Sequence, residues 1–499
     1  MKAKNLLDLM NFGSSVAEFD NDLEKHFIET ETFRSVIKGL GDIIAGDKGT
    51  GKTAIYRILK KNYRSYNILD NVEVIDAFNP QGDPIFQRLT NGPSLTEDQF
   101  RTFWKAYVFS LVGNWLLNIY PRDYTDSIKK LSDTLTHLGL EATDVSPETI
   151  FGKLHRLVEK MLTPSAVEAE FSLTEAGMPV LIPRVEFGGD LDKGTIIYNG
   201  DYLKVLDNAV KSTDLEIWVL FDRLDEAFAG NSKTEIPALR ALLRSYLDLS
   251  SLNTIKLKLF LRKDLFRRII KGGFVNLTHV NARRIEIIWD DEDLWSMVTR
   301  RLRSSAGFVA ALGDPNIDDA KLLSILLPDQ IDVGDRKPTT DKWIMNRIRD
   351  GNNNRPPRNM IDLLNKSREA QIRREQREAR EISEMAGPIL EADSVKRAFR
   401  QLSEQRVQDT LLAEAEELIP MIEAFRDGKS EHNAETLKAT IGPVDNFGLV
   451  IQSLVDIGFL EEFGSNHKIP MLYRDGLKVR QGKAFSTNET SDEGGGVEE

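Results

Sequence analysis

The chain has 499 residues, with 78 acidic against 66 basic side chains, a net charge of −12, 41% hydrophobic residues and no cysteine. The chain is too long to form a single hydrophobic core, so we predict several domains. The negative net charge disfavours a protein that is constitutively coated with nucleic acid, because Lys and Arg drive phosphate binding. The missing cysteines exclude disulfides, thiolate chemistry and cysteine-bound zinc. No apolar run approaches the roughly 20 residues of a membrane span, so we expect no membrane partner, and the absence of cysteine fits a cytoplasmic protein.

The first motif that carries chemistry is residues 46–53, Gly-Asp-Lys-Gly-Thr-Gly-Lys-Thr, between a short apolar run and a stretch with helical spacing. A strand, this Gly-x-x-x-x-Gly-Lys-Thr pattern and a helix are together typical of a phosphate-binding loop, although a glycine-rich surface loop fits the motif alone. Its three glycines would turn with positive φ, so that backbone N–H groups surround phosphates. We expect Lys52 to reach the β- and γ-phosphates and Thr53 to ligate Mg²⁺. The predicted nucleotide-binding residues are Gly46, Asp47, Lys48, Gly49, Thr50, Gly51, Lys52 and Thr53.

After a predicted strand at residues 72–76, a helix begins at Thr96, which forms a capping box with Gln99. Aromatic residues then recur at helical spacing, which predicts a buried face rather than a base-stacking surface. The main members of this stripe are Phe100, Phe103, Trp104, Tyr107 and Trp115. Residues 80–200 interrupt the core pattern and are expected to form an insertion.

A nearly continuous apolar run, residues 215–221, ends at Asp222 in the sequence Asp-x-x-Asp-Glu. Such a run predicts a central parallel strand, and a carboxylate that follows it lies at the sheet edge where ligands bind. We therefore expect Asp222 to hold Mg²⁺ through its water shell. Asp225 or Glu226 would orient and deprotonate the attacking water, and the choice between them stays open. The alternative for these two acids is an acidic helix N-terminus.

A third strand is predicted at residues 255–261, and Arg262 follows it. If this strand neighbours the acidic one, Arg262 lies on the same sheet edge as Asp222 and is a candidate γ-phosphate sensor. The alternative is an ion pair with Asp264. Residues 285–289 are predicted as the last core strand.

From residue 290 the spacing is helical, and three arginines cluster near the end of the first helix. An arginine directed at a neighbouring subunit's γ-phosphate gives a rate gain of about 10³–10⁵-fold, while a solvated helix end is the other interpretation. A proline-containing turn at 352–358 opens another helix. Residues 391–480 hold sixteen acidic against eleven basic side chains, which favours contacts with protein over contacts with phosphate. The clustered arginines are Arg300, Arg301 and Arg303.

This order of parts resembles a group of bacterial P-loop ATPases near the AAA+ and signal-transducing (STAND, including NACHT and KAP-type) NTPases. The resemblance rests on the loop motif, the strand end Phe-Asp-Arg-Leu-Asp-Glu, the strand before Arg262 and the turn Asn-Arg-Pro-Pro-Arg at 354–358. It implies an α/β fold: a mostly parallel sheet flanked by helices, with the acidic strand next to the strand that feeds the loop. A helical lid and a C-terminal winged-helix domain complete the implied fold.

Under this resemblance the nucleotide is ATP with Mg²⁺, and homo-oligomers complete the sites across subunits. Lys52, Thr53 and Asp222 take the roles given above, and Arg262 resembles a first sensor. Arg358 resembles the lid arginine of a second sensor, although the extra proline in the turn leaves the choice between Arg355 and Arg358 open. The predicted domains are residues 1–289 for the core with an insertion at about 80–200, 290–386 for the lid, 387–484 for the winged-helix-like domain and 485–499 for a disordered tail.

The function that follows is an ATP-driven regulatory switch or sensor, acting with a partner protein or a separate effector. Many members of this broad class act in bacterial anti-phage defence, so the resemblance implies such a role. Two alternatives remain: a DNA-binding initiator or loader-type AAA+ ATPase, and a nucleotide-binding scaffold that does not hydrolyse ATP.

Overall fold

The computed structural model describes residues 2–78, 95–162, 171–173, 179–181, 201–224, 232–271, 273–381, 387–413 and 415–485. The chain forms two compact units. Unit 1 consists of Met1–Ile28, Asp47–Gly51 and Ile288–Glu499, and unit 2 consists of Glu29–Gly46 and Lys52–Ile287. This division differs from the predicted domain bounds, because the first 28 residues and part of the loop group with the C-terminal half.

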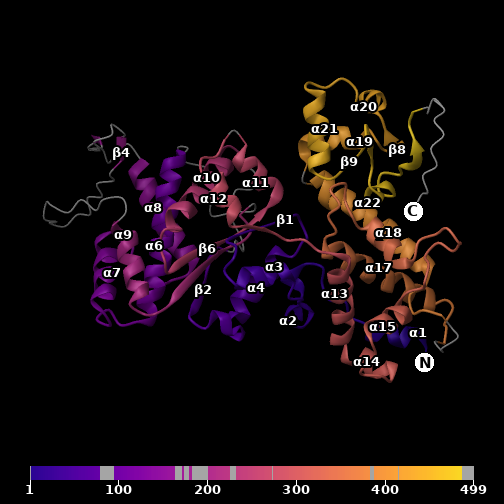
Figure 1. Ribbon diagram of the computed structural model, residues 1–499, viewed down its shortest axis with the longest axis horizontal. Helices are drawn as coiled ribbons and strands as arrows, with labels where there is room; N and C mark the ends of the chain where they lie inside the picture. Colours follow the sequence, from indigo (N-terminus) through magenta and orange to yellow (C-terminus); the bar gives the residue numbers. More distant parts are fainter. Residues whose placement is uncertain are drawn as a thin grey trace. The chain divides into compact units, whose positions relative to one another are not determined.

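Unit 2 contains a parallel α/β sheet and its helices, shown in Figure 1. Its elements are α3 (Glu31–Ile37), β1 (Ile43–Gly46), α4 (Lys52–Asn62), η2 (Tyr63–Ser65), η3 (Asn67–Leu69), β2 (Val72–Phe78), α6 (Glu97–Ile119), α7 (Asp126–His137), α8 (Pro147–Leu162), β3 (Phe171–Leu173), β4 (Pro179–Leu181), α9 (Asp201–Lys211), β5 (Glu216–Phe221), α10 (Ser232–Leu249), β6 (Ile255–Arg262), α11 (Lys263–Ile270), α12 (Leu277–Ala282) and β7 (Arg284–Glu286).

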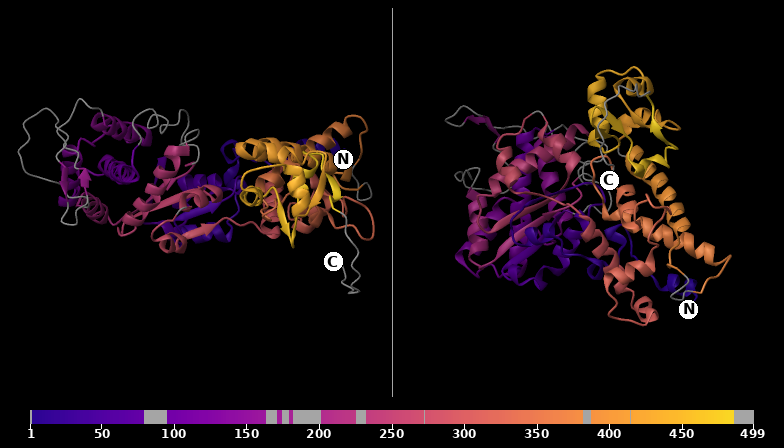
Figure 2. Two further views of the ribbon diagram at one scale, coloured as in Figure 1. Left: turned by 90° about the horizontal axis from the view of Figure 1, so that it is seen from above. Right: turned by 45° about the vertical axis from the view of Figure 1, so that its right-hand side comes forward.

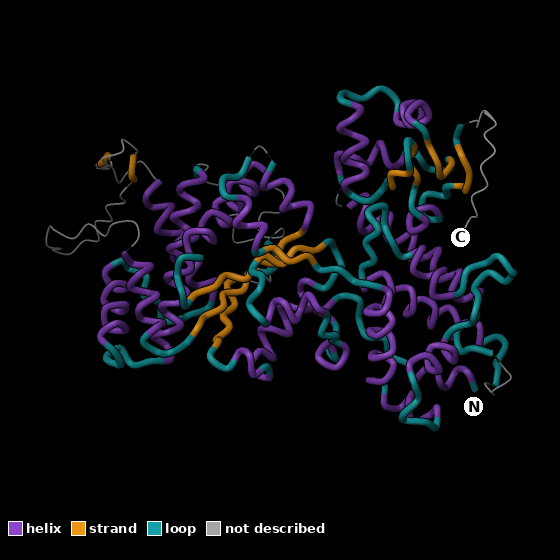
Figure 3. The backbone as a smooth tube through the Cα atoms, in the orientation of Figure 1, coloured by secondary structure: helices purple, strands orange, loops and turns teal. Residues whose placement is uncertain are grey.

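Five strands form the sheet in the order β2-β5-β6-β1-β7, and every neighbouring pair is parallel. Figure 3 shows these strands in orange, with helices around them. The expected parallel sheet with flanking helices is confirmed. The expected pairing of the acidic strand with the loop strand is wrong, because β6 lies between β5 and β1. Leu259 of β6 pairs with Phe221 on one side and Ile43 on the other. Strand β6 is buried along nearly its whole length, which suits a central position.

Successive residues of each strand face opposite sides of the sheet, so the two faces carry different clusters. On one face, Val219 and Leu257 join an apolar cluster with α6 and α10. On the other, Tyr56 of α4 packs edge-on against Phe260, with ring centroids 5.9 Å apart. Figure 1 shows α10 and α11 on one side of the strands and α3 and α4 on the other.

Helix α6 has the predicted capping box between Thr96 and Gln99. The aromatic stripe is buried as expected, since Trp104 and Tyr107 have no exposed surface. The indole of Trp104 donates to the carbonyl of Ala238 in α10 at 2.9 Å. The stripe therefore belongs to the core of unit 2.

Unit 1 is mostly helical and ends in a small sheet. Its elements are α1 (Ala3–Leu9), η1 (Ala17–Phe19), α2 (Leu23–His26), α13 (Asp291–Ser304), α14 (Ala306–Leu312), α15 (Asp319–Leu326), α16 (Thr340–Arg347), α17 (Pro357–Glu375), α18 (Ala392–Arg406), the π-helical turn η4 (Val407–Leu412), η5 (Glu416–Leu418), α19 (Ile419–Glu423), β8 (Lys429–His432), α20 (Ala434–Ile441), α21 (Phe447–Asp456), β9 (Glu461–Phe463), β10 (Asn466–Lys468), α22 (Met471–Arg474) and β11 (Arg480–Lys483).

The N-terminal segment belongs to unit 1 because its apolar side chains are buried there. Leu6 and Leu7 of α1 lie in one apolar cluster with residues of α13, α17 and α18. A second anchor is polar: buried Asp20 contacts both His26 and Arg301, each at 3.0 Å. Helices α17 and α18 run side by side in the same unit (Figure 2).

The C-terminal sheet has the strand order β11-β8-β10-β9. Its β9–β10 hairpin spans residues 461–468. Residues 486–499 of the predicted tail lie outside the described residues, as do residues 80–94, 163–170, 174–178 and 182–200 of the predicted insertion. Among the described helices, none is both long and apolar enough to cross a membrane.

A buried ion pair joins β1 to β6 at the start of the loop strand. Lys258 has no exposed surface, and its Nζ donates to the Asp42 carboxylate at 2.8 Å and to the Gly41 carbonyl at 2.8 Å. Arg283 and Tyr246 also donate to Asp42, at 2.9 and 3.1 Å. This network fixes the start of β1, and with it the strand that leads into the loop.

Replacing Asp42 by Asn should destabilise the protein by about 3–5 kcal/mol, because the buried Lys258 charge loses its counter-ion. Chemical denaturation of the two proteins measures the difference. The matched control is Glu31→Gln, which breaks the exposed Arg34–Glu31 pair of 3.7 Å and should change stability by less than about 1 kcal/mol. Equal denaturation midpoints for Asp42→Asn and wild type would contradict a stabilising role for the network.

Candidate nucleotide site

The candidate site lies at the carboxyl ends of the parallel strands. Gly46, the last residue of β1, pairs with Arg262, the last residue of β6, and Asp222 directly follows β5. The chain after β1 leads to β2 at one edge of the sheet, and the chain after β6 leads to β7 at the other edge. The connections from these two neighbouring strands therefore run in opposite directions. Such a switch point is where open α/β sheets bind ligands.

The loop between β1 and α4 has the backbone conformation that its glycines allow. Gly49 and Gly51 have φ values of 79° and 100°, in the left-handed region. The expectation of positive φ at Gly46 is wrong, because Gly46 continues the extended strand β1. The amine of Lys52 donates to the Gly46 carbonyl at 2.9 Å. The end of the strand and the start of the helix are thus tied together in unit 2.

Asp222 is the buried acid of the site, with 2% of its surface exposed. The hydroxyl of Thr53 and the backbone N–H of Arg223 hydrogen-bond to it, and the charge of Lys52 acts on it. Burial nevertheless raises the pKa of Asp222 to about 6, because desolvation disfavours the ionised form more than these three contacts favour it. Its Oδ2 atom is buried and has no hydrogen-bond partner among the described residues.

Backbone strain marks the same position. Arg223, directly after Asp222, has φ = 55°, a conformation that costs a residue with a side chain of order 1–3 kcal/mol. Strain of this kind persists where surrounding contacts impose it and is concentrated at functional sites. The turn that presents Asp222 is therefore held by the fold rather than by local preference.

The donor set suits Mg²⁺ that arrives with a nucleotide. Magnesium is commonly bound through one or two carboxylates together with phosphates and water. Asp222 and Thr53 supply one carboxylate and one hydroxyl, and the buried Oδ2 atom lacks the partner that a magnesium-bound water would provide. Over the part of the chain that the structure describes, no group of three or more His, Asp or Glu side chains is arranged to bind a metal alone.

Within unit 1, the loop residues Asp47–Gly51 contact three separate segments. The indole N–H of Trp289 donates to the Thr50 carbonyl at 2.8 Å, and Lys48 donates to the Asp409 carbonyl at 3.2 Å. A Cβ added at Gly49 would lie 2.9 Å from the Cβ of Arg358. Glycine is therefore required at this position for the close approach as well as for its φ.

Of the two arginines predicted for the lid, Arg358 is the one that lies against the loop. Its backbone N–H points to the Gly49 carbonyl at 3.5 Å, whereas Arg355 forms an ion pair with Asp291 at 3.1 Å. Arg262 makes the predicted alternative contact, a two-pronged pair with Asp264 at 3.0 Å on each prong. A sensor role for Arg262 would require this pair to rearrange.

The three clustered arginines have different environments in unit 1. Arg301 is buried against Asp20, and Arg303 pairs with Asp319. Arg300 is exposed and donates to the Lys25 carbonyl at 2.8 Å. Arg300 is thus the member whose position suits a contact with another subunit. Asp225 and Glu226, the two candidate bases, lie outside the described residues.

Sequence reasoning missed Trp289 and Arg223. Trp289 was assigned to the last strand, but β7 ends at Glu286 and Ile288 is 67% exposed. Hydrophobic periodicity does not distinguish a tryptophan at the end of a strand from one that hydrogen-bonds to a loop. Arg223 carried one signal, its place directly after the acid at the end of a buried strand.

No family model matches the chain. The chain is 22% identical over 304 residues to the "Putative transposon gamma-delta 80.3 kDa protein" of Escherichia coli (strain K12). The match covers 58% of this chain and 39% of that protein, so the chain matches well under half of its relative's length.

Three solved structures are similar over most of the chain. The Walker-type ATPase PABY2304 of Pyrococcus abyssi has a TM-score of 0.40 at 10% identity, covering 91% of this chain and 96% of that one. The ORC2 protein of Aeropyrum pernix (ADPNP–ADP complexes) has 0.36 at 13% identity, covering 92% and 93%. The ORC1 protein of Aeropyrum pernix in complex with DNA has 0.35 at 12% identity, covering 93% and 96%. Scores of this size establish neither a family nor an activity.

The class is defined by the chain's own features. A Gly-x-x-x-x-Gly-Lys-Thr loop joins the first strand of a parallel sheet to a helix, and a buried acid follows the strand two places away. This is the α/β fold of the P-loop NTPases.

Asp222→Asn should make the nucleotide-free protein more stable at pH 8. The Asp222 carboxyl has a pKa of about 6 in the fold against the ordinary aspartate value of 3.8, so ionising it weakens the wild-type fold as pH rises between these values. Asparagine does not titrate, and the gain is about 3 kcal/mol at pH 8, declining toward zero by about pH 4. Urea denaturation at the two pH values measures it, with the exposed Asp335→Asn as control. A less stable variant at pH 8 would contradict the burial argument.

Proposed function

We propose that this chain binds ATP with Mg²⁺ and hydrolyses it, as a regulatory switch that acts with a partner protein. The observation that carries the proposal is the buried Asp222, which accepts from Thr53, is coupled to Lys52 and keeps an unpartnered oxygen. A structural role alone would not favour an acid whose ionised form burial penalises so strongly. Magnesium and a triphosphate would supply the missing positive charge and ligands.

The residues of this chain would act by positioning the nucleotide and by stabilising charge electrostatically. Lys52 would exchange the Gly46 carbonyl for the β- and γ-phosphate oxygens, and the loop N–H groups would donate to the same phosphates. Asp222 and Thr53 would orient Mg²⁺, which offsets the charge that develops on the phosphates during in-line attack by water. Asp225 or Glu226 remains the proposed base. Dication binding would lower the pKa of Asp222 and keep it ionised at neutral pH.

The switch would work through the contacts of the loop in unit 1. A phosphate that reorders the loop would alter the hydrogen bond from Trp289 to Thr50 and the packing of Arg358 on Gly49. Both side chains belong to segments that continue into α13 and α17, so loop geometry and helix position are linked. Homo-oligomers, and a contact through Arg300 between copies, extend this proposal. The expectation of an anti-phage role stays a prediction.

Lys52→Ala should raise the dissociation constant for ATP at least tenfold and remove Mg²⁺-dependent phosphate release, because the β/γ-phosphate contact is lost. Equilibrium binding of a fluorescent ATP analogue and a phosphate-release assay measure both effects. Lys61→Ala, in the last turn of the same helix, is the matched control and should behave as wild type. ATP binding without any phosphate release in the wild-type protein would favour the scaffold function, and unchanged binding in Lys52→Ala would contradict the site.

A second candidate is a DNA-binding initiator or loader. We infer a winged-helix domain from the order α19, β8, α20, α21 and the β9–β10 hairpin, and such a domain would support this candidate. The third helix of this domain, α21, argues against DNA binding, because it contains no Lys or Arg and exposes Leu449 at 64%. A helix of this composition lacks the cations that phosphate contacts require. We therefore propose that this domain contacts protein.

Duplex DNA binding by the full chain should stay at the non-specific level, weaker than about 1 µM at physiological salt. Filter binding at 50 and 200 mM salt, with and without ATP, measures it. Sub-micromolar binding that falls steeply with salt would instead favour the initiator. In that case Lys438→Ala and Lys468→Ala, on α20 and the hairpin, should weaken it.

A further inference from the structure

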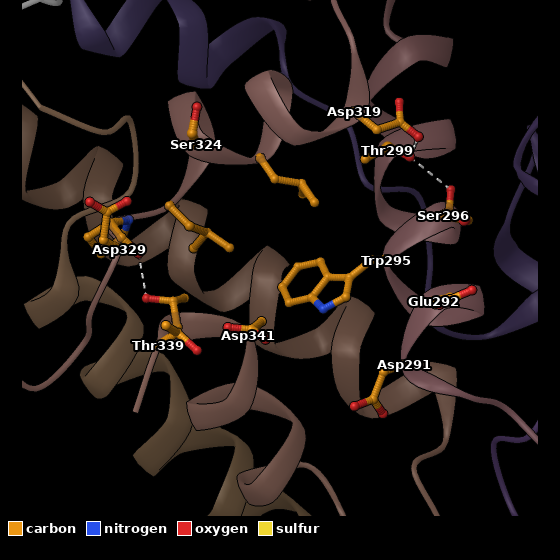
Figure 4. A pocket seen from close by; sticks show the side chains of 14 residues that line it. Asp291, Glu292, Trp295, Ser296, Thr299, Asp319, Ser324, Asp329, Thr339 and Asp341 are labelled. Atoms are coloured by element: carbon orange, nitrogen blue, oxygen red, sulfur yellow. Dashed lines mark hydrogen bonds between the residues drawn. The ribbon is translucent and has the colours of Figure 1, made fainter. Parts of the chain in front are cut away.

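Unit 1 contains a pocket of about 830 Å³ that the nucleotide site does not use. Fourteen residues of α13, α15, α16 and the connecting segments line it, and Figure 4 shows Trp295 pointing into its middle. The volume is within the range of ligand pockets and is large enough for several side chains of a polypeptide.

The base of the pocket is apolar and partly accessible. Trp295, Leu323 and Pro328 each keep part of their surface exposed, and buried Leu327 lies beside them. An apolar surface bordered by polar groups marks an interaction site on a folded protein. Tryptophan is also the residue type most often found as an anchor of protein interfaces.

Trp295 has an unused donor. Over the described residues its indole N–H has no hydrogen-bond partner, whereas four other tryptophans donate to a backbone or side-chain oxygen. These are Trp104, Trp218, Trp289 and Trp343. The Trp295 ring packs against the apolar cluster of unit 1 on one side, while its N–H stays available as a donor for an external contact.

The rim of the pocket is acidic, and none of the lining residues is Lys or Arg. Two of its five acids are neutralised, Asp291 by Arg355 and Asp319 by Arg303. The other three form no ion pair with any described residue; they are Glu292, Asp329 and Asp341. Several of these acids lie in first helical turns, where the helix dipole favours them. The helix dipole explains why acids occur at these helix starts. It does not explain why they line one cavity together with Trp295.

We propose that this pocket docks a segment of a partner protein that carries Arg or Lys beside apolar side chains. The three carboxylates without an ion pair surround an apolar base, so they would attract several positive charges carried by one polypeptide segment. A positive charge over the Trp295 ring would add a cation–π attraction. The sign of the charge excludes nucleic acid and anionic lipid as occupants. Docking does not require ATP hydrolysis, so it stands apart from the nucleotide site.

The test is selection of a random 12-residue peptide library, displayed on phage, against the full-length protein. Recovered peptides should be enriched in Arg or Lys next to Leu, Ile or Phe. A representative peptide should bind at least tenfold more weakly to Trp295→Ala and to the triple variant Glu292→Gln, Asp329→Asn, Asp341→Asn, and its affinity should fall with salt. The control triple variant Asp335→Asn, Glu404→Gln, Glu435→Gln should bind as wild type.

Neutralising exposed carboxylates leaves the core intact, so the triple variant tests the pocket even if Trp295→Ala fails to fold. Recovery of no peptide, recovery without basic enrichment, or equal binding to the pocket variants would overturn the proposal. Loss of self-association in the triple variant, measured by native mass, would replace the partner protein by a second copy of the chain. Peptide binding by Lys52→Ala should equal that of wild type, which separates a failure of docking from a failure of the nucleotide site.

Discussion

The site depends on one unfavourable placement: Asp222, an acid buried directly after strand β5. The Thr53 hydroxyl, the Arg223 N–H and the Lys52 charge together do not compensate for its desolvation, so the pKa of Asp222 is about 6. We propose that the fold keeps this group for a ligand that brings positive charge. Three features hold that acid and the loop strand in place. They are the parallel sheet, the strained Arg223 directly after the acid, and the Lys258–Asp42 ion pair at the start of β1.

Much of this could be predicted from the sequence because its signals are local. The glycine spacing of the loop, the apolar run before Asp222 and the capping box at Thr96 each specify a backbone conformation within a few residues. The buried aromatic stripe of α6 follows from helical periodicity in the same way. The strands, their parallel direction and the edge that carries the acid were therefore accessible from pattern alone.

The rest depends on long-range pairing, which periodicity does not encode. Strands β5 and β6 are similar apolar runs, so nothing local decides which of them neighbours β1. The hydrogen bond from Trp289 to Thr50 and the packing of Arg358 on Gly49 join residues more than two hundred positions apart. The pocket around Trp295 likewise forms only when three helices come together, and its acids look like ordinary helix starts in the sequence.

The most direct measurement is a crystal structure of the chain with Mn²⁺ in place of Mg²⁺ and a non-hydrolysable ATP analogue. The account predicts an anomalous manganese peak about 2.1 Å from the Thr53 hydroxyl, linked to the Asp222 carboxylate through a bound water. The Lys52 amine should lie on the β- and γ-phosphates. A triphosphate bound elsewhere, or manganese absent from the space between Thr53 and Asp222, would contradict it.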